Sequence, residues 1–158
     1  VLYADDLAKA GEGGAWIKEK VDARRAAVQA SFVVDTMTFL YKGGRCSGIA
    51  AFVASVLRIK PSIIVSDGKM VVGKKYMGAT DKAIIKYVAD TLKSYPHPDL
   101  KYVFVTHTSA RPEVVAKVKE EVLAVYPDAN IIETLAGATV TSHCGKGTLG
   151  VLYFNDAE

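Results

Sequence analysis

The chain has 158 residues, half of them apolar, so it can bury one substantial core, and a single domain is the simplest expectation. Its 20 Lys and Arg residues stand against 17 Asp and Glu residues, and the charges are interspersed, which argues against a nucleic-acid partner. No stretch reaches the ~18 to 20 apolar residues of a membrane span. The two cysteines lie far apart and suggest neither a disulfide nor a metal site, so they predict free thiols in a reducing cytoplasm.

The first thirty residues predict two helices. Residues 1–10 have the pattern of an amphipathic helix that is already under way, and the glycines at 11, 13 and 14 supply a stop and a flexible joint. Residues 15–29 carry a partial 3.6-residue apolar stripe with cationic residues on the other face. Because the chain also lacks an initiator Met, we expect a fragment or a processed product.

A short β-branched run over 31–36 predicts a buried strand, and a glycine-rich turn over 42–48 follows it. This turn feeds an apolar helical stretch over 49–57, and a turn at a helix N-terminus favours an anion. The turn matches neither the Walker nor the Rossmann glycine pattern, so it does not support nucleotide binding. The alternative is that the glycines form an ordinary tight turn and that Arg45 is a solvated charge.

The middle of the chain predicts a hairpin and a long helix. Residues 59–65 form a strand pattern in which Pro61 favours an edge or strand-start position. The pair Asp67 and Gly68 predicts a type I′ turn that joins this strand to another over 70–72. A helix should then start from Thr80 as its N-cap and end at the prolines at 96 and 98.

The last third of the chain alternates strand and helix patterns. A strand over 102–105, a helix that starts near Pro112 and a strand from Ile131 predict a βαβ unit with two parallel strands. The apolar stripe of that helix consists of Val114, Val115, Val118, Val122 and Leu123. The final apolar run over 149–154 fits either a helix segment or a last strand. The whole pattern predicts an α/β fold with a mixed sheet and helices packed on its faces.

The run from Thr141 to Gly147 packs an imidazole among hydroxyls, a thiol and glycines, which is the chemistry of an anion site. An ordinary loop between two elements has the same composition. His143 is the better ligand candidate of the three histidines. His107 follows a buried strand, where a site residue and a packing residue are equally expected, and His97 lies between prolines at the surface.

Catalysis by the chain alone has little support in the sequence. Cys144 directly follows His143, so the two side chains tend to point in different directions, and a base must face its nucleophile. What remains is a set of donors that fits a bound anion. Arg45, His143 and the adjacent hydroxyls could hold one carboxylate, and the apolar run over 49–57 together with the strand residues could line an alkyl tail.

Three ordered motifs resemble the DegV family, the bacterial fatty-acid-binding family that includes the binding subunits of fatty acid kinase. The first joins the strand at 32–36 to Leu40 and the Lys-Gly-Gly-Arg run at 42–45. The second is Leu57, Ile-Lys-Pro at 59–61 and Asp67-Gly68. The third covers 137–150, with His143 among small and hydroxyl residues.

This resemblance implies a long-chain fatty acid whose carboxylate is held by His143, with Arg45 close to it. The neighbouring Thr141 and Ser142 would add donors, and the supporting residues would be Gly44, Gly145, Cys144 and His107. It further implies that the protein needs no cofactor and is no enzyme itself. It would present the acid to a separate ATP-dependent fatty acid kinase in bacterial phospholipid metabolism, with transient contact to the membrane surface.

The chain departs from the family pattern at several positions. Ser142 and Cys144 replace the two threonines that flank the family histidine, and Lys146 replaces a proline. The family also carries an arginine before the Thr80 helix that helps in docking the kinase. The run Lys-Lys-Tyr-Met-Gly at 74–78 has no such arginine.

The resemblance also predicts the domain organisation. Residues 1–30 would be the closing helices of an N-terminal domain that is largely missing, and residues 31–158 would form the DegV-like second, C-terminal domain. The missing domain carries Asp-Ser and Thr-Ser segments whose hydroxyls complete the family's carboxylate site. Two alternatives stay open: a hydrolase or transferase for acyl substrates that uses His143 or His107, and an interaction domain without a ligand.

Overall fold

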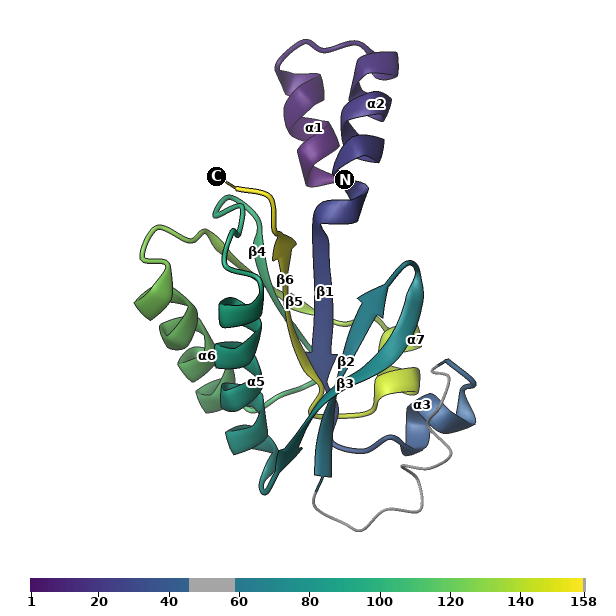
Figure 1. The fold of residues 1–158 in the computed structure, drawn as a ribbon, viewed down its shortest axis with the longest axis vertical. Coiled ribbons are helices and arrows are strands. Elements are labelled where there is room, and N and C mark those ends of the chain that lie inside the picture. The colour runs from purple at the N-terminus through teal and green to yellow at the C-terminus, as the bar shows by residue number, and fades with distance from the viewer. Residues whose placement is uncertain (46–58, 158) are drawn as a thin grey trace.

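The fold is built on one mixed β-sheet, seen in a computed structural model that describes residues 1–45 and 59–157 (Figure 1). The expected helix over 49–57 and Cys46 lie outside the described residues. The strands are β1 (Val28–Val33), β2 (Ile59–Ser66), β3 (Lys69–Met77), β4 (Val103–His107), β5 (Ile131–Leu135) and β6 (Leu149–Phe154). Their order in the sheet is β3-β2-β1-β6-β4-β5.

The pairing of the strands confirms the predicted α/β class. β4 and β5 are parallel and are joined by α6 (Pro112–Val125), which is the expected βαβ unit. β6 lies antiparallel between β1 and β4, so the run over 149–154 is a strand and not a helix. The other neighbours are also antiparallel, which makes the sheet mixed.

The hairpin between β2 and β3 forms as the Asp-Gly pair predicts. Asp67 has a φ of 50° and Gly68 a φ of 72°, the left-handed values that a type I′ turn requires at both central positions. Ser66 pairs with Lys69 across the turn. The strand pairing therefore continues up to the two turn residues.

Pro61 does not lie at an edge or a strand start, so that prediction was wrong. It is the third residue of β2, which lies between β3 and β1. The register of β2 against β3 shifts between Pro61 and Ile63, and such an irregularity accommodates a residue without an N–H donor. The Pro61 carbonyl still accepts a hydrogen bond from the backbone of Val34 at 3.2 Å.

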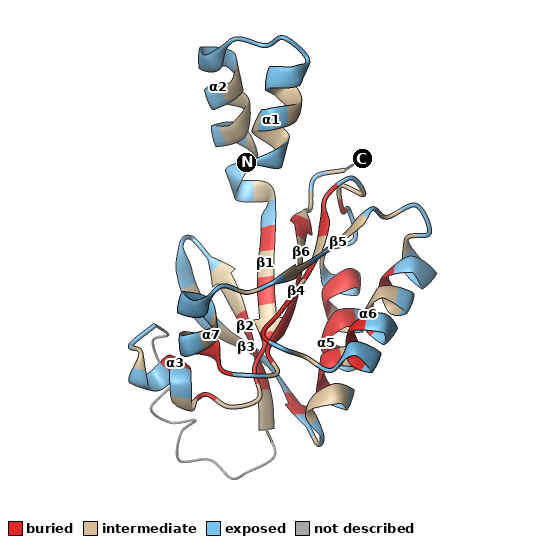
Figure 2. Cartoon of the chain, turned by 180° about the vertical axis from the view of Figure 1, so that it is seen from behind, coloured by how far each residue is buried: buried red, intermediate tan, exposed pale blue. Residues whose placement is uncertain are grey.

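The long helix α5 (Thr80–Ser94) and α6 cover one face of the sheet (Figure 2). Their buried side chains pack against the odd-numbered residues of β1, β4 and β6, among them Val33, Val105 and Val151. The predicted stripe of α6 is buried except for Leu123, which is 40% exposed. This layer holds the larger part of the hydrophobic core.

Thr80 is the first residue of α5, and Ala79 is its N-cap, so the predicted cap was wrong by one position. The Thr80 hydroxyl donates instead to the carboxylate of Asp35, just beyond β1. Lys60 donates to the same carboxylate at 2.7 Å. The Thr80 side chain therefore takes part in a long-range hydrogen-bond network with Asp35 and Lys60 and does not cap the helix.

Among the described residues, α3 (Thr38–Lys42) and α7 (Ala138–Cys144) lie on the other face of the sheet. These short helices contact each other and bury a smaller cluster that contains Val34, Leu40 and Cys144. The same face carries half-buried apolar side chains such as Phe32 and Leu152.

The helices α1 (Leu2–Lys9) and α2 (Gly14–Arg24) form a hairpin that projects from one end of the sheet beside the last strand (Figure 1). Neither contains a buried residue. The second helix is shorter than the expected 15–29, because a 3₁₀ turn over Arg25–Ala27 leads directly into β1. The first strand therefore starts at Val28, three residues before the predicted start.

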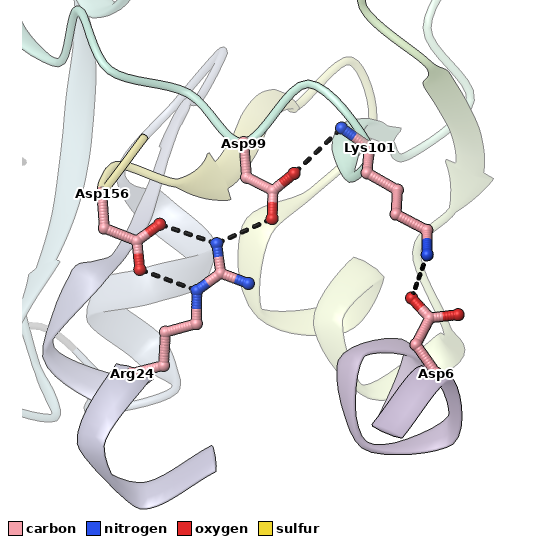
Figure 3. Close-up of polar contacts among 5 residues, drawn as sticks. All are labelled: Asp6, Arg24, Asp99, Lys101 and Asp156. Atoms are coloured by element: carbon pink, nitrogen blue, oxygen red, sulfur yellow. Dashed lines mark hydrogen bonds and ion pairs between the residues drawn. The ribbon is translucent and has the colours of Figure 1, made fainter. Parts of the chain in front are cut away.

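Arg24 anchors this hairpin to the C-terminal segment (Figure 3). Its guanidinium donates to both carboxylate oxygens of Asp156 at 2.7 Å and to Asp99 at 2.7 Å, and it lies 4.0 Å from the centre of the Phe154 ring. Two parallel bonds to one carboxylate give the pair a fixed geometry. A further ion pair joins Lys101 to Asp6 of α1 at 2.5 Å. Within the described residues no helix could cross a bilayer.

Candidate functional site

A cavity of about 440 Å³ lies next to α7, on the face of the sheet opposite α5 and α6. Even-numbered strand residues form its floor, and α7 and the β2–β3 hairpin supply side chains around it. The lining side chains that matter below are those of Ala30, Phe32, Gly150 and Leu152 on the floor, Val65 and Met70 on the hairpin, Thr139, Val140 and His143 on α7, and Arg45. The lining is therefore mainly apolar, as small-molecule sites usually are.

The floor of the cavity follows from the alternation of side chains along the strands. In β1 the odd-numbered residues are buried under α5, so Ala30 and Phe32 point to the opposite face. Ala30 pairs with Leu152 of β6, which brings the two floor strands together. Gly150 allows β6 to lie close to β1 at the cavity floor, because a Cβ at this position would lie 2.6 Å from the carbonyl oxygen of Ser31.

The run that includes His143 is helical up to Cys144, so the loop expected there is wrong for its first half. α7 is short and is held by tertiary contacts, because Cys144 packs in the smaller core cluster. Gly145 ends it with a φ of 80°, and a Cβ at this position would lie 2.6 Å from the ring of Phe39. The glycine thus permits both the turn and the close contact between α7 and α3.

The imidazole of His143 lies against the backbone at the end of α3. A Cβ added to Gly43 would lie 2.2 Å from its Nδ1. Arg45 comes two residues later, is exposed, and lines the same cavity. Two motifs that are far apart in the sequence therefore meet at one cavity.

His143 and Arg45 both direct hydrogen-bonding groups to this cavity. Among the described residues, neither the imidazole nor the guanidinium has a hydrogen-bonding or ion-pair partner. A free imidazole and a free guanidinium are donors that suit a carboxylate or a phosphate. The cavity thus combines an apolar floor with unsatisfied donors.

His107, by contrast, is already engaged. It is the last residue of β4 and not a residue after the strand, and only 6% of it is exposed. Its Nδ1 accepts a bond from the Ala110 backbone at 3.2 Å, so Nε2 donates to Glu133, also at 3.2 Å. Hydrogen bonds from Lys119 and then His107 hold the pKa of Glu133 below its usual range. These contacts fix the ring within the protein, and His107 also lines the cavity.

The hydroxyls next to His143 are directed into the protein backbone. Thr141 donates to the Ala136 carbonyl at 3.2 Å, and Ser142 donates to the Thr139 carbonyl at 2.8 Å. Neither residue is among the described residues that line the cavity, and the same is true of Gly44 and Gly145. The structure therefore brings His143 and Arg45 together but leaves Thr141 and Ser142 outside the cavity wall.

Cys144 does line the cavity, but it is a buried free cysteine. Burial raises the pKa of its thiol, which lowers the fraction of reactive thiolate. His97 is exposed, and its backbone N–H bonds to the side chain of Asn155. Among the described residues no group of three His, Cys, Asp or Glu side chains is placed to hold a metal ion.

Sequence reasoning did not identify the individual residues of the cavity floor, and it missed one polar residue of the cavity wall. Thr139 lies one helical turn before His143 on α7 and lines the cavity, and its hydroxyl makes no hydrogen bond to another described residue. Its four-residue spacing from His143 could have indicated it, had a helix been expected there. The floor residues Ala30 and Phe32 were indicated by the alternation of β1, but the predicted strand began too late to include Ala30.

The sequence profile described as "Uncharacterised protein, DegV family" matches residues 1–156. The chain belongs to the DegV family. It is 32% identical over 157 residues to Protein DegV of Bacillus subtilis, covering 96% of this chain and 54% of that protein. It is 27% identical over 158 residues to a DegV domain-containing protein of Clostridium perfringens, covering 100% of this chain and 54% of the relative. The chain thus spans about half the length of these curated DegV relatives.

Solved structures of DegV proteins share the fold. The structure of DegV from Bacillus subtilis, described as a fatty acid binding protein, matches at a TM-score of 0.74 and 29% identity, covering 96% of this chain and 54% of that one. The Streptococcus pneumoniae fatty acid kinase (Fak) B3 protein, solved with linoleic acid, matches at a TM-score of 0.84 and 19% identity, with coverages of 97% and 53%. At that identity the second likeness concerns the DegV fold alone.

Proposed function

We propose that the chain binds a long-chain fatty acid and supplies the histidine side of its carboxylate site. The observation that carries this proposal is the cavity of about 440 Å³ in which an apolar floor meets the uncommitted side chains of His143 and Arg45. An amphiphile with one anionic group and an alkyl chain satisfies both parts of this lining. Burial of the ligand's alkyl chain would supply most of the binding free energy, at about 0.8 kcal/mol for each methylene group.

In the proposed complex the carboxylate accepts hydrogen bonds from His143 and Arg45. The Nδ1 edge of the imidazole packs on Gly43, so Nε2 is the nitrogen that donates to the ligand. Thr139 adds a hydroxyl from the same wall of the cavity. Thr141 and Ser142 act through their bonds to backbone carbonyls, which support the helix that carries His143.

The chemistry on the bound acid is assigned to a partner. Similarity to the Streptococcus pneumoniae fatty acid kinase B3 protein supports presentation of the carboxylate to a separate ATP-dependent kinase. The family arginine before α5 is absent, and Lys74 and Tyr76 of that segment both contact Asp90, at 3.0 Å each. We therefore propose that a kinase contacts groups other than this arginine at the N-terminal end of α5. The interaction would take place in the cytoplasm, and the protein would contact the membrane surface transiently during exchange of the fatty acid.

Native mass spectrometry and lipid extraction of the purified protein test the proposal. We expect a co-purifying fatty acid, or stoichiometric binding of added palmitate or oleate after delipidation. A folded protein that carries no acyl chain and binds neither added acid would contradict it. Turnover of acyl substrates without ATP or a kinase would favour the acyl-directed enzyme instead.

A further inference from the structure

β1 and the β2–β3 hairpin separate from each other next to the cavity. β1 pairs with β2 only over Ser31–Val33, and the first half of β1 pairs with β6 alone. Towards its turn the hairpin diverges from β1, as Figure 1 shows. A second hollow of about 820 Å³ lies in this gap, between the hairpin turn, the start of β1 and the end of α2.

Ala30 and Val65 line both hollows, so the two hollows adjoin at these residues, and this junction is called the passage below. Ala30 comes from the half of β1 that pairs with β6 and not with β2, and Val65 lies on β2, where it pairs with Met70. The neighbouring floor residues, Phe32 on β1 and Leu152 opposite Ala30 on β6, are larger. At position 30, where the two hollows adjoin, the side chain is only a methyl group.

The second hollow has a mixed lining. Asp22, Arg25, Ser66 and Asp67 are polar residues of this lining, whereas Val28 and Val65 provide apolar surface. An alkyl tail that extended through the passage would therefore meet charged groups as well as apolar surface. Such an arrangement imposes an upper limit on the useful length of a chain.

We propose that Ala30 determines the acyl chain length that the protein prefers. The carboxylate lies at His143 and Arg45, the chain runs over the floor of the first hollow, and the end of a long chain passes between Ala30 and Val65. This inference rests on the proposed function. It adds the direction in which the acyl chain runs and the residue that limits its length.

The test compares the affinities of the wild-type protein and Ala30→Leu for decanoate, dodecanoate, palmitate and stearate. We expect the variant to bind stearate about tenfold more weakly than the wild type, the change that follows when roughly two methylene groups lose their burial. Decanoate, which does not reach the passage, should keep its affinity within about twofold. Val65→Leu at the other side of the passage should give the same length profile, and it serves if Ala30→Leu fails to fold.

Ala136→Leu is the matched control, because Ala136 lines the first hollow but not the second. It should lower the affinities for all four acids to a similar degree. Equal losses for short and long acids in Ala30→Leu, or an unchanged profile, would overturn the inference while the wild type still binds fatty acids. A wild type that binds none of the four acids would instead contradict the proposed function.

Discussion

The imidazole of His143 packs directly on the backbone of Gly43, where a Cβ would lie 2.2 Å from Nδ1. Gly43 has a φ of −79°, which any residue can adopt. The requirement for glycine at this position therefore comes from the histidine and not from the local backbone. It explains why a glycine pair and a distant histidine belong to the same site.

We expect Gly43→Ala to weaken fatty-acid binding by about 1 kcal/mol or more, because the new methyl group displaces the imidazole from its hydrogen bond to the carboxylate. A fluorescent fatty-acid displacement assay measures the effect. Gly14→Ala is the control, since nothing lies within 4 Å of a Cβ there and α2 is remote from the cavity. Wild-type affinity in a folded Gly43→Ala protein would contradict the contact.

His143→Ala should weaken the binding of palmitate by about 1 to 3 kcal/mol, the usual cost of losing a hydrogen bond to a charged group. Isothermal titration gives the affinity directly. His97→Ala, at an exposed position that contacts the protein through its backbone N–H, should leave it unchanged. If both variants bind alike, the carboxylate does not lie at His143.

Tyr87→Phe should lower the free energy of unfolding by about 1 to 3 kcal/mol, because it leaves buried polar groups without partners. The Tyr87 hydroxyl donates to the Ser31 carbonyl at 2.7 Å and accepts from the Val151 backbone at 3.2 Å. Urea denaturation monitored by circular dichroism measures the change. Tyr41→Phe removes the hydroxyl of a half-exposed tyrosine and should change stability little.

Local patterns in the sequence were sufficient for most of the fold. The hairpin followed from Asp67 and Gly68, whose left-handed backbone is a property of two adjacent residues. The βαβ unit followed from the period of the apolar residues. The position of Pro61 could not be predicted, because the bulge that accommodates it depends on the pairing of β2 with β3.

For the site, residue type indicated His143 and Arg45, and the structure places both at one cavity. The helical state of α7 was missed, because hydroxyls and glycines locally favour a loop and the helix is held by packing of Cys144. The cavity floor was missed for a similar reason. It depends on the pairing of Ala30 with Leu152, two residues near opposite ends of the chain.

Acid should loosen the attachment of the α1–α2 hairpin. Hydrogen bonding from Arg24 holds the pKa of Asp156 below its usual range, so the unfolded chain binds this proton more readily than the folded one. The pair therefore stabilises the fold above the ordinary carboxyl pKa of about 3.9, and this contribution is lost as the pH falls through the lower folded value.

Unfolding free energies measured between neutral pH and about pH 3 check this expectation, with the pH range set by the carboxyl pKa. Asp156→Asn should be less stable than the wild type at neutral pH and should lose less stability in acid. Identical pH profiles for the two proteins would exclude Asp156 as a source of the acid sensitivity.

The ion pair between Arg24 and Asp156 also constrains the order in which parts of the fold form during synthesis. The two residues are 132 positions apart, so a ribosome makes Arg24 long before its carboxylate partner. Until then α1 and α2 can associate with each other, but the ion pair that fixes their direction relative to the sheet has no acceptor at Asp156. During synthesis, α1 and α2 therefore reach their final orientation only after β6 has emerged.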